Sequence, residues 1–181
     1  MAGRGSQGDL DAWVLETAPR ATAYARSLLG SIHEAEDIVQ DCYCRLIAKA
    51  GTYDLERDGL KLLFTAIGNA CINLRTRRKP AFSLSRPDGA GGERTEDPAD
   101  AKAVAPADLA VGNELEVAIA QGLRLLPTQQ RAAVELKSFG YSQQEIAEML
   151  GITTSNAGVL VHRARQTLAQ YLAPYLAGET N

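Results

Sequence analysis

Apolar residues with helical spacing fall into two blocks of the chain, residues 9–80 and 109–177. The clearest stripe of the first block is made by Tyr24, Ala25, Leu28 and Leu29. Their spacing of i, i+1, i+4 and i+5 is that of one face of a helix. Between the blocks, residues 81–108 are rich in Pro and Gly and poor in large apolar side chains, which is typical of a flexible linker. The pattern predicts an all-α fold of two small helical domains joined by this linker.

Local signals place the helices of the first block. Gly30 and Ser31 interrupt the first apolar stripe, and Ser31 with Glu34 matches a capping box that would open a helix to about Ala50. A polar turn is expected over residues 52–59. A further apolar helical run over residues 60–74 ends in a basic segment and stops at Pro80.

The second block carries a helix-turn-helix pattern within residues 123–172. Ser142 and Glu145 match a capping box, and Gly151 falls where the chain must leave the helix with a positive φ. Thr153 is the expected cap of the next helix. A small residue at Ala147, four positions before Gly151, would let two helices cross closely.

The second helix of this pair would enter a major groove. Its candidate DNA contacts are Thr154, Ser155, Asn156, Val159, His162, Arg163 and Arg165. A structural helical hairpin with a solvated face is the alternative.

Composition narrows the class of protein. No run of about 18 apolar residues predicts a membrane span, and the first eight residues do not resemble a signal peptide, so we expect a cytoplasmic protein. On a helix, Cys42 and Cys44 would point about 200° apart and could not hold one metal together. We therefore predict no metal site and no cofactor, with Cys71 and one of that pair buried as small apolar residues.

Charge is distributed unevenly along a chain whose net charge is −3. Residues 1–80 carry 11 basic and 10 acidic residues, residues 81–108 carry 3 and 6, and residues 109–181 carry 5 and 6. DNA binding would therefore depend on local basic clusters, and the free protein should bind DNA weakly.

Two sequence segments resemble the sigma-70 family. Residues 126–165, which share "LPTQQRAAVELKSFGYSQQEIAEMLGIT" with the family pattern, resemble sigma region 4, whereas "HEAEDIVQDCYCRL" and "LLFTAIGNACINLRTRRK" resemble regions 2.2 and 2.3–2.4. The order, the linker and the short chain are those of the extracytoplasmic-function (ECF) group. The resemblance implies a promoter-specificity subunit, which is not an enzyme, with region 2 at 9–80, a linker at 81–108 and region 4 at 109–177.

The resemblance also implies partners and site residues. Core RNA polymerase would be bound through its β′ clamp helices and β flap, with Asp37, Gln40 and Asp41 on the clamp helices. These three residues have the spacing of one polar helix face, for which a merely solvated face is the alternative. Promoter DNA would be bound at its −35 element by region 4 and at its −10 element by region 2, and an anti-sigma factor is the expected inhibitor.

Region 2 of the family reads a flipped base of the −10 element, and Asn69 occupies the matching position. Its amide offers both a donor and an acceptor, and Gly68 beside it indicates a local break in the helix. Phosphate contacts are implied for Arg75, Arg77, Arg78 and Lys79. A basic helix end that only complements the helix dipole is the alternative.

Three positions depart from the family pattern. Leu62 stands where a Trp is common, and Gly158 and Leu160 stand where basic residues are frequent, which puts DNA contacts from these positions in doubt. Two other functions stay open from the sequence: a stand-alone helix-turn-helix regulator, which the second block alone would permit, and an enzyme, for which no catalytic arrangement is visible.

Overall fold

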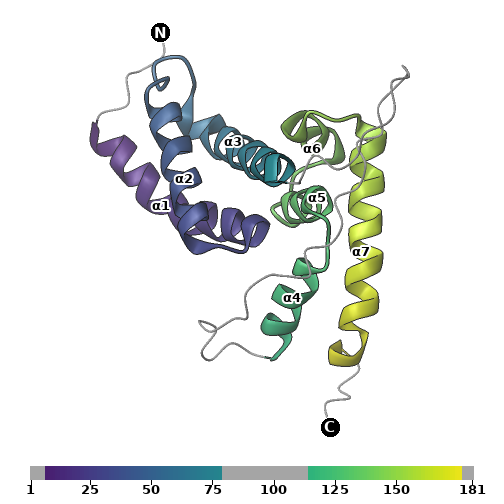
Figure 1. Cartoon of the computed structure of the whole chain (residues 1–181). Coiled ribbons are helices and arrows are strands. Elements are labelled where there is room, and N and C mark those ends of the chain that lie inside the picture. Colours follow the sequence, from purple (N-terminus) through teal and green to yellow (C-terminus); the bar gives the residue numbers. More distant parts are fainter. Residues whose placement is uncertain (1–6, 79–113, 177–181) are drawn as a thin grey trace.

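The computed structural model describes residues 7–78 and 114–176, and within these ranges all regular structure is helical. The helices form two groups that lie side by side (Figure 1). The first group contains α1 (Gln7–Leu29), α2 (Ile32–Ile47) and α3 (Leu55–Arg78). The second contains α4 (Glu114–Arg124), α5 (Thr128–Ser138), α6 (Gln143–Leu150) and α7 (Thr154–Leu176). The prediction of an all-α fold with two helical domains is confirmed.

The predicted linker over residues 81–108 lies outside the described residues, so its flexibility and the domain bounds stay predictions. Within the described helices, no segment is long and apolar enough to cross a membrane.

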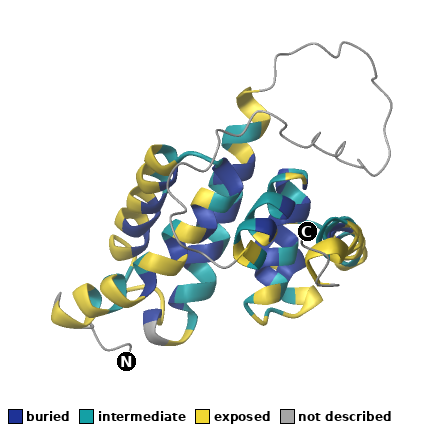
Figure 2. Cartoon of the chain, turned by 90° about the horizontal axis from the view of Figure 1, so that it is seen from below, coloured by how far each residue is buried: buried dark blue, intermediate teal, exposed yellow. Residues whose placement is uncertain are grey.

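The first group is a three-helix unit in which α1, α2 and α3 all contact one another. Buried residues lie on the sides of the helices that face each other, and exposed residues lie on the outer sides (Figure 2). Cys42 and Cys71 are buried and Cys44 is exposed, as predicted. The described residues hold no group of three or more His, Cys, Asp or Glu that could bind a metal.

Helix α2 shows half of the predicted capping box. The Ser31 side chain accepts from the Glu34 backbone N–H at 3.5 Å, but the Glu34 carboxylate accepts from Arg78 Nη1 at 2.5 Å. The helix ends at Ile47, earlier than expected, because the N–H groups of Lys49 and Ala50 bond to carbonyls three residues back. Such bonds form tight turns rather than a continued α-helix.

Helix α3 differs from prediction at its start and in its middle. It begins at Leu55 rather than Leu60, because the Asp54 carboxylate caps the Arg57 N–H at 3.1 Å and Leu55 is buried. The predicted break at Gly68 is wrong, since α3 is continuous to Arg78. Gly68 has a packing reason instead: a Cβ there would lie 3.0 Å from the Tyr24 hydroxyl.

The helix-turn-helix has the local geometry that the sequence predicts. Ser142 and Glu145 form both bonds of a capping box at the start of α6. Gly151 ends α6 with φ 65°, in the left-handed region that glycine adopts at low cost. Thr153 Oγ1 accepts from the Asn156 N–H at 3.2 Å and so caps α7.

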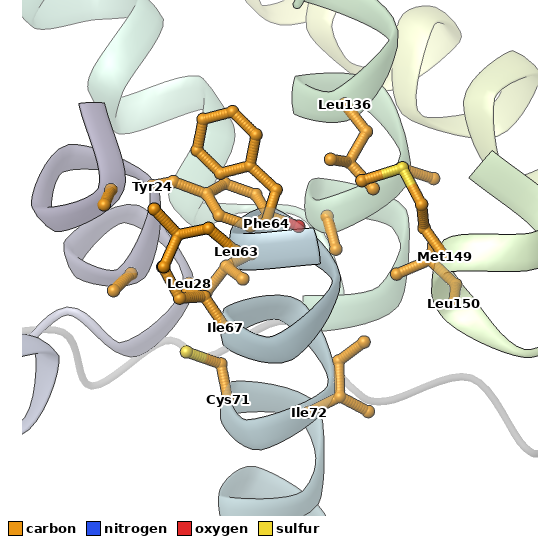
Figure 3. Packing of buried hydrophobic residues seen from close by; sticks show 14 of the residues in the cluster. Tyr24, Leu28, Leu63, Phe64, Ile67, Cys71, Ile72, Leu136, Met149 and Leu150 are labelled. Carbon is orange, nitrogen blue, oxygen red and sulfur yellow. The ribbon is translucent and has the colours of Figure 1, made fainter. Parts of the chain in front are cut away.

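The two groups share one apolar core (Figure 3). Helix α3 lies between them, with Tyr24 and Leu28 of α1 on one side and Leu136, Met149 and Leu150 of α5 and α6 on the other. The main contacts between the groups are made by α3 with α6 and by α1 with α5. We call this surface the interdomain contact.

Candidate nucleic-acid interface

The predicted polymerase-binding residues form an exposed polar stripe on α2. Asp37, Gln40 and Asp41 are all exposed, whereas the opposite side of the helix, with Val39 and Leu46, is buried. Asp41 pairs with Arg45 at 2.6 Å, in an exposed ion pair worth at most about 1 kcal/mol. So weak a pair leaves the Asp41 carboxylate available to a partner. Helix α2 makes its main contacts with α1 and α3, and the stripe is not part of these contacts' buried face.

Asn69, the predicted base-reading residue, lies at the interdomain contact. It is half-buried on α3, and its Nδ2 donates to the Met149 carbonyl oxygen at 3.0 Å. Asn69, Ile72 and Asn73 line a small pocket together with Gln129, Leu150, Ile152 and Leu160 of the second group. The predicted base-reading residue is therefore in contact with the helix-turn-helix.

The arginines at the basic end of α3 differ in whether they contact other parts of the chain or face solvent. Arg75 is half-buried and donates to the Leu29 carbonyl oxygen at the end of α1. Arg78 forms the ion pair with Glu34, whereas Arg77 is exposed on the last turn. Lys79 lies outside the described residues. Among the three described arginines, Arg77 is thus the best placed to contact a phosphate.

The predicted DNA contacts on α7 lie mostly at its surface. Those that are exposed are Thr154, Ser155, Val159, His162, Arg163 and Arg165, and Asn156 is half-buried. Val159, with 42% exposure, is one of the apolar side chains exposed on the described surface. The N-terminal half of α7 follows the tight turn at Gly151, the arrangement by which a recognition helix presents its first residues to base edges.

The structure explains why Gly158 and Leu160 of α7 are not basic residues as in the family pattern. At Gly158, a Cβ would collide with the amide nitrogen of Gln143 and lie 3.0 Å from its Cδ. Because Gly158 has no side chain, Gln143 Nε2 can lie against it and donate to the Thr154 carbonyl oxygen at 2.7 Å. Leu160 is only 5% exposed and packs in the shared core, where a basic side chain would leave a charge buried.

Sequence reasoning missed the polar residues where α1 meets α5. Arg131 is only 3% exposed and donates to the carbonyl oxygens of Arg124 at 3.0 Å, Leu126 at 2.9 Å and Ser27 at 2.5 Å. The Ser27 hydroxyl donates to the Glu135 carboxylate. Burial raises the pKa of Glu135 to about 7, although the Ser27 hydrogen bond and the Arg131 charge lower it. No local pattern identifies the contacts with Ser27, because Ser27 is 104 positions from Arg131 and 108 positions from Glu135.

Comparison with known proteins identifies both groups. Residues 13–80 match the family Sigma-70 region 2, and residues 116–168 match Sigma-70, region 4. The ECF RNA polymerase sigma factor SigW of Bacillus subtilis is 31% identical over 147 residues, which cover 80% of this chain and 79% of SigW. The ECF RNA polymerase sigma factor SigE of Mycolicibacterium smegmatis is 29% identical over 176 residues, and the match spans 94% of this chain and 65% of SigE.

A solved structure shows the same fold. The sigma factor RpoE of Bartonella quintana, determined in complex with the anti-sigma factor NepR, superposes with a TM-score of 0.65 at 23% identity. The match covers 91% of this chain and 97% of RpoE. The region 2 match removes the basis for a stand-alone helix-turn-helix regulator. This chain belongs to the ECF group of sigma-70 family RNA polymerase sigma factors.

Proposed function

We propose that this sigma factor divides its work among three surfaces: α2 for polymerase, α3 for the −10 element and α7 for the −35 element. The observation that carries the proposal is that the residues the family pattern assigns to polymerase, Asp37, Gln40 and Asp41, form one exposed stripe on α2. A stripe of two carboxylates and an amide favours a basic partner helix. The β′ clamp helices of core polymerase are the partner that the family resemblance assigns.

Promoter reading follows from the other two surfaces. Asn69 would hydrogen-bond the edge of a base that has left the duplex stack, and Arg77 would contact a phosphate beside it. On α7, Ser155 and Asn156 would reach base edges, and Arg163 would contact the backbone. With few cations on these surfaces, we expect the free chain to bind DNA weakly and polymerase to hold it on the promoter.

Binding to core polymerase tests the first surface. Asp41→Arg should weaken binding by about tenfold or more, because it places a like charge against a basic partner. Glu16→Arg is the matched control: it makes the same charge change at an exposed position on α1 and should bind like the wild type. Far-ultraviolet circular dichroism should show the same helix content for both variants. Equal binding by all three proteins would overturn the assignment of α2.

Run-off transcription on genomic fragments tests the other surfaces. Core polymerase with the wild-type chain should initiate at discrete promoters. Asn69→Ala should retain polymerase binding but lose strand opening, which permanganate reactivity of unpaired thymines at the −10 element would measure. Arg163→Ala should reduce affinity for promoter DNA and lower its salt dependence by about one unit of slope. Failure of the wild type to direct any transcript would refute the proposed function.

An anti-sigma factor is the regulator that we propose. The sigma factor RpoE of Bartonella quintana was solved bound to the anti-sigma factor NepR, and this chain has the same fold. Addition of a cognate anti-sigma factor should suppress the run-off transcripts without degrading the chain.

A further inference from the structure

Gly158 interrupts the exposed face of the recognition helix α7. Successive residues of an α-helix are turned by about 100°, so five residues in the first half of α7 share an arc of about 140°. In order around the helix, they are Thr154, Gly158, His162, Ser155 and Val159. Every buried residue of α7 lies outside this arc. The arc therefore presents side chains to solvent everywhere except at Gly158.

The side chain of Gln143 fills this gap from the neighbouring helix α6. Gln143 is the first residue of α6 and is exposed. Its Nε2 donates to the Thr154 carbonyl oxygen at 2.7 Å, one turn of α7 before Gly158. A Cβ at Gly158 would collide with this nitrogen and lie 3.4 Å from Gln143 Oε1. The amide of Gln143 thus occupies the place that a side chain at position 158 would take.

The bond to Thr154 leaves part of the Gln143 amide unused. A glutamine amide has two N–H donors and one carbonyl acceptor. Thr154 takes one donor, and no described residue donates to Gln143 Oε1. One N–H and one carbonyl oxygen remain for a ligand. In the major groove, adenine presents one acceptor, N7, beside one donor, the N6 amino group, and glutamine pairs with adenine through these two atoms.

The same bond orders the side chain before any DNA binds. An exposed glutamine is otherwise free to rotate, and a side chain that is already ordered loses less conformational entropy on binding. Gln144, the next residue of α6, makes the contrast. It is also exposed, but its Nε2 donates to Glu148 Oε1 of its own helix at 3.4 Å. Of these two glutamines, Gln143 is the one held against the recognition helix.

We propose that Gln143 reads an adenine of the −35 element, from the position where the family pattern has a basic side chain on α7. This inference rests on the proposed role of α7 at the −35 element. Because the Gln143 amide carries no charge, its contact distinguishes bases and releases no counterions from the DNA backbone. The contact that Gly158 cannot make is thus supplied by α6.

Base discrimination by the holoenzyme tests the inference. Core polymerase carrying the chain is bound to a promoter found by run-off transcription, with each base pair of its −35 element replaced in turn. For the wild type, replacement of one adenine should weaken binding by about fivefold or more, as expected for loss of a bidentate base contact. Gln143→Ala should bind all four bases at that position equally and discriminate normally elsewhere. Gln144→Ala is the matched control and should discriminate like the wild type.

Gln143→Lys separates base reading from a merely structural bond between α6 and α7. The lysine ammonium can still donate to the Thr154 carbonyl, but it has no acceptor for the N6 amino group of adenine. The preference at this position should therefore shift from adenine to guanine, whose N7 and O6 are both acceptors. Retention of the adenine preference by Gln143→Lys would overturn the inference, because the side chain would then only link the two helices.

Gly158→Ala moves the amide without removing it and should also lose the adenine preference. All four variants should keep the helix content of the wild type in circular dichroism. Equal weakening of Gln143→Ala on every −35 sequence would overturn base reading in favour of a phosphate contact. Unchanged discrimination by Gln143→Ala would overturn it as well. If the wild-type holoenzyme discriminates at no −35 position, the proposed role of α7 itself fails, and the inference fails with it.

Discussion

A buried carboxyl at the interdomain contact should make the stability of this protein depend on pH. Glu135 is only 8% exposed and lies between the Ser27 hydroxyl of α1 and Arg131 on its own helix. Burial raises the pKa of Glu135 from 4.5 to about 7, and the Ser27 hydrogen bond and the Arg131 charge lower it only in part. Glu135→Gln removes the titratable group and keeps its shape and a hydrogen-bond acceptor for Ser27.

The direction of the pH dependence follows from how many protons the folded and the unfolded protein bind. Between about pH 4.5 and about pH 7, the folded protein holds a proton on Glu135 that the unfolded chain has released. The stabilisation from protonated Glu135 is therefore complete below the pKa that Glu135 has in the unfolded chain. It is lost as the pH rises through the pKa of Glu135 in the folded protein. The pKa difference corresponds to about 3 kcal/mol in the free energy of unfolding.

Urea unfolding at about pH 5 and about pH 8 measures this dependence. From about pH 5 to about pH 8, the free energy of unfolding of the wild type should fall by up to about 3 kcal/mol more than that of Glu135→Gln. Glu36→Gln, which removes an exposed carboxyl on α2, should follow the wild type. Parallel pH profiles for the wild type and Glu135→Gln would refute the reasoning, because Glu135 would then be hydrated in the folded protein.

Three substitutions in the helix-turn-helix have predictable effects. Ser142→Ala removes the capping box with Glu145 and should lower the unfolding free energy by about 1 kcal/mol in urea titrations; no change would mean that the box is not formed in solution. Gly151→Ala should lower the free energy of unfolding by about 1 kcal/mol, because the backbone φ is 65° at this position. An unchanged melting temperature would contradict the left-handed backbone conformation of Gly151. Gly158→Ala should displace Gln143, but the stability should change by no more than about 1 kcal/mol, because helix propensity favours Ala. The same variant should alter the affinity of the holoenzyme for −35 DNA in a gel-shift assay. Unaltered affinity would show that the position of Gln143 does not matter for DNA binding.

The helix-turn-helix could be predicted in detail because its signals are local. The caps at Ser142 and Thr153 and the turn at Gly151 each depend on residues a few positions apart, and the structure confirms all three. The exposed stripe on α2 was predictable for the same reason, since helix periodicity alone decides which residues share a face.

The interdomain contact could not be predicted, because its partners are far apart in the chain. Ser27 and Glu135 are 108 positions apart, and Asn69 and Met149 are 80 apart. Gly68 illustrates the resulting error. Helical propensity made a glycine within α3 indicate a break, but the helix is continuous and the glycine makes room for Tyr24. Leu160 similarly looked like a lost phosphate contact, whereas it is buried in the shared core.

The position of the three surfaces determines the order in which partners can bind. The stripe of Asp37, Gln40 and Asp41 lies on α2, whose main contacts are with α1 and α3, and it is exposed in this structure. Asn69, in contrast, is occupied by α6. On the proposed assignment, the polymerase-binding stripe is exposed in this structure, whereas the Asn69 amide donates to a carbonyl of α6. Because the surfaces that we propose for DNA binding carry few cations, DNA alone supplies little binding free energy. We therefore expect polymerase binding to come first and promoter reading to follow.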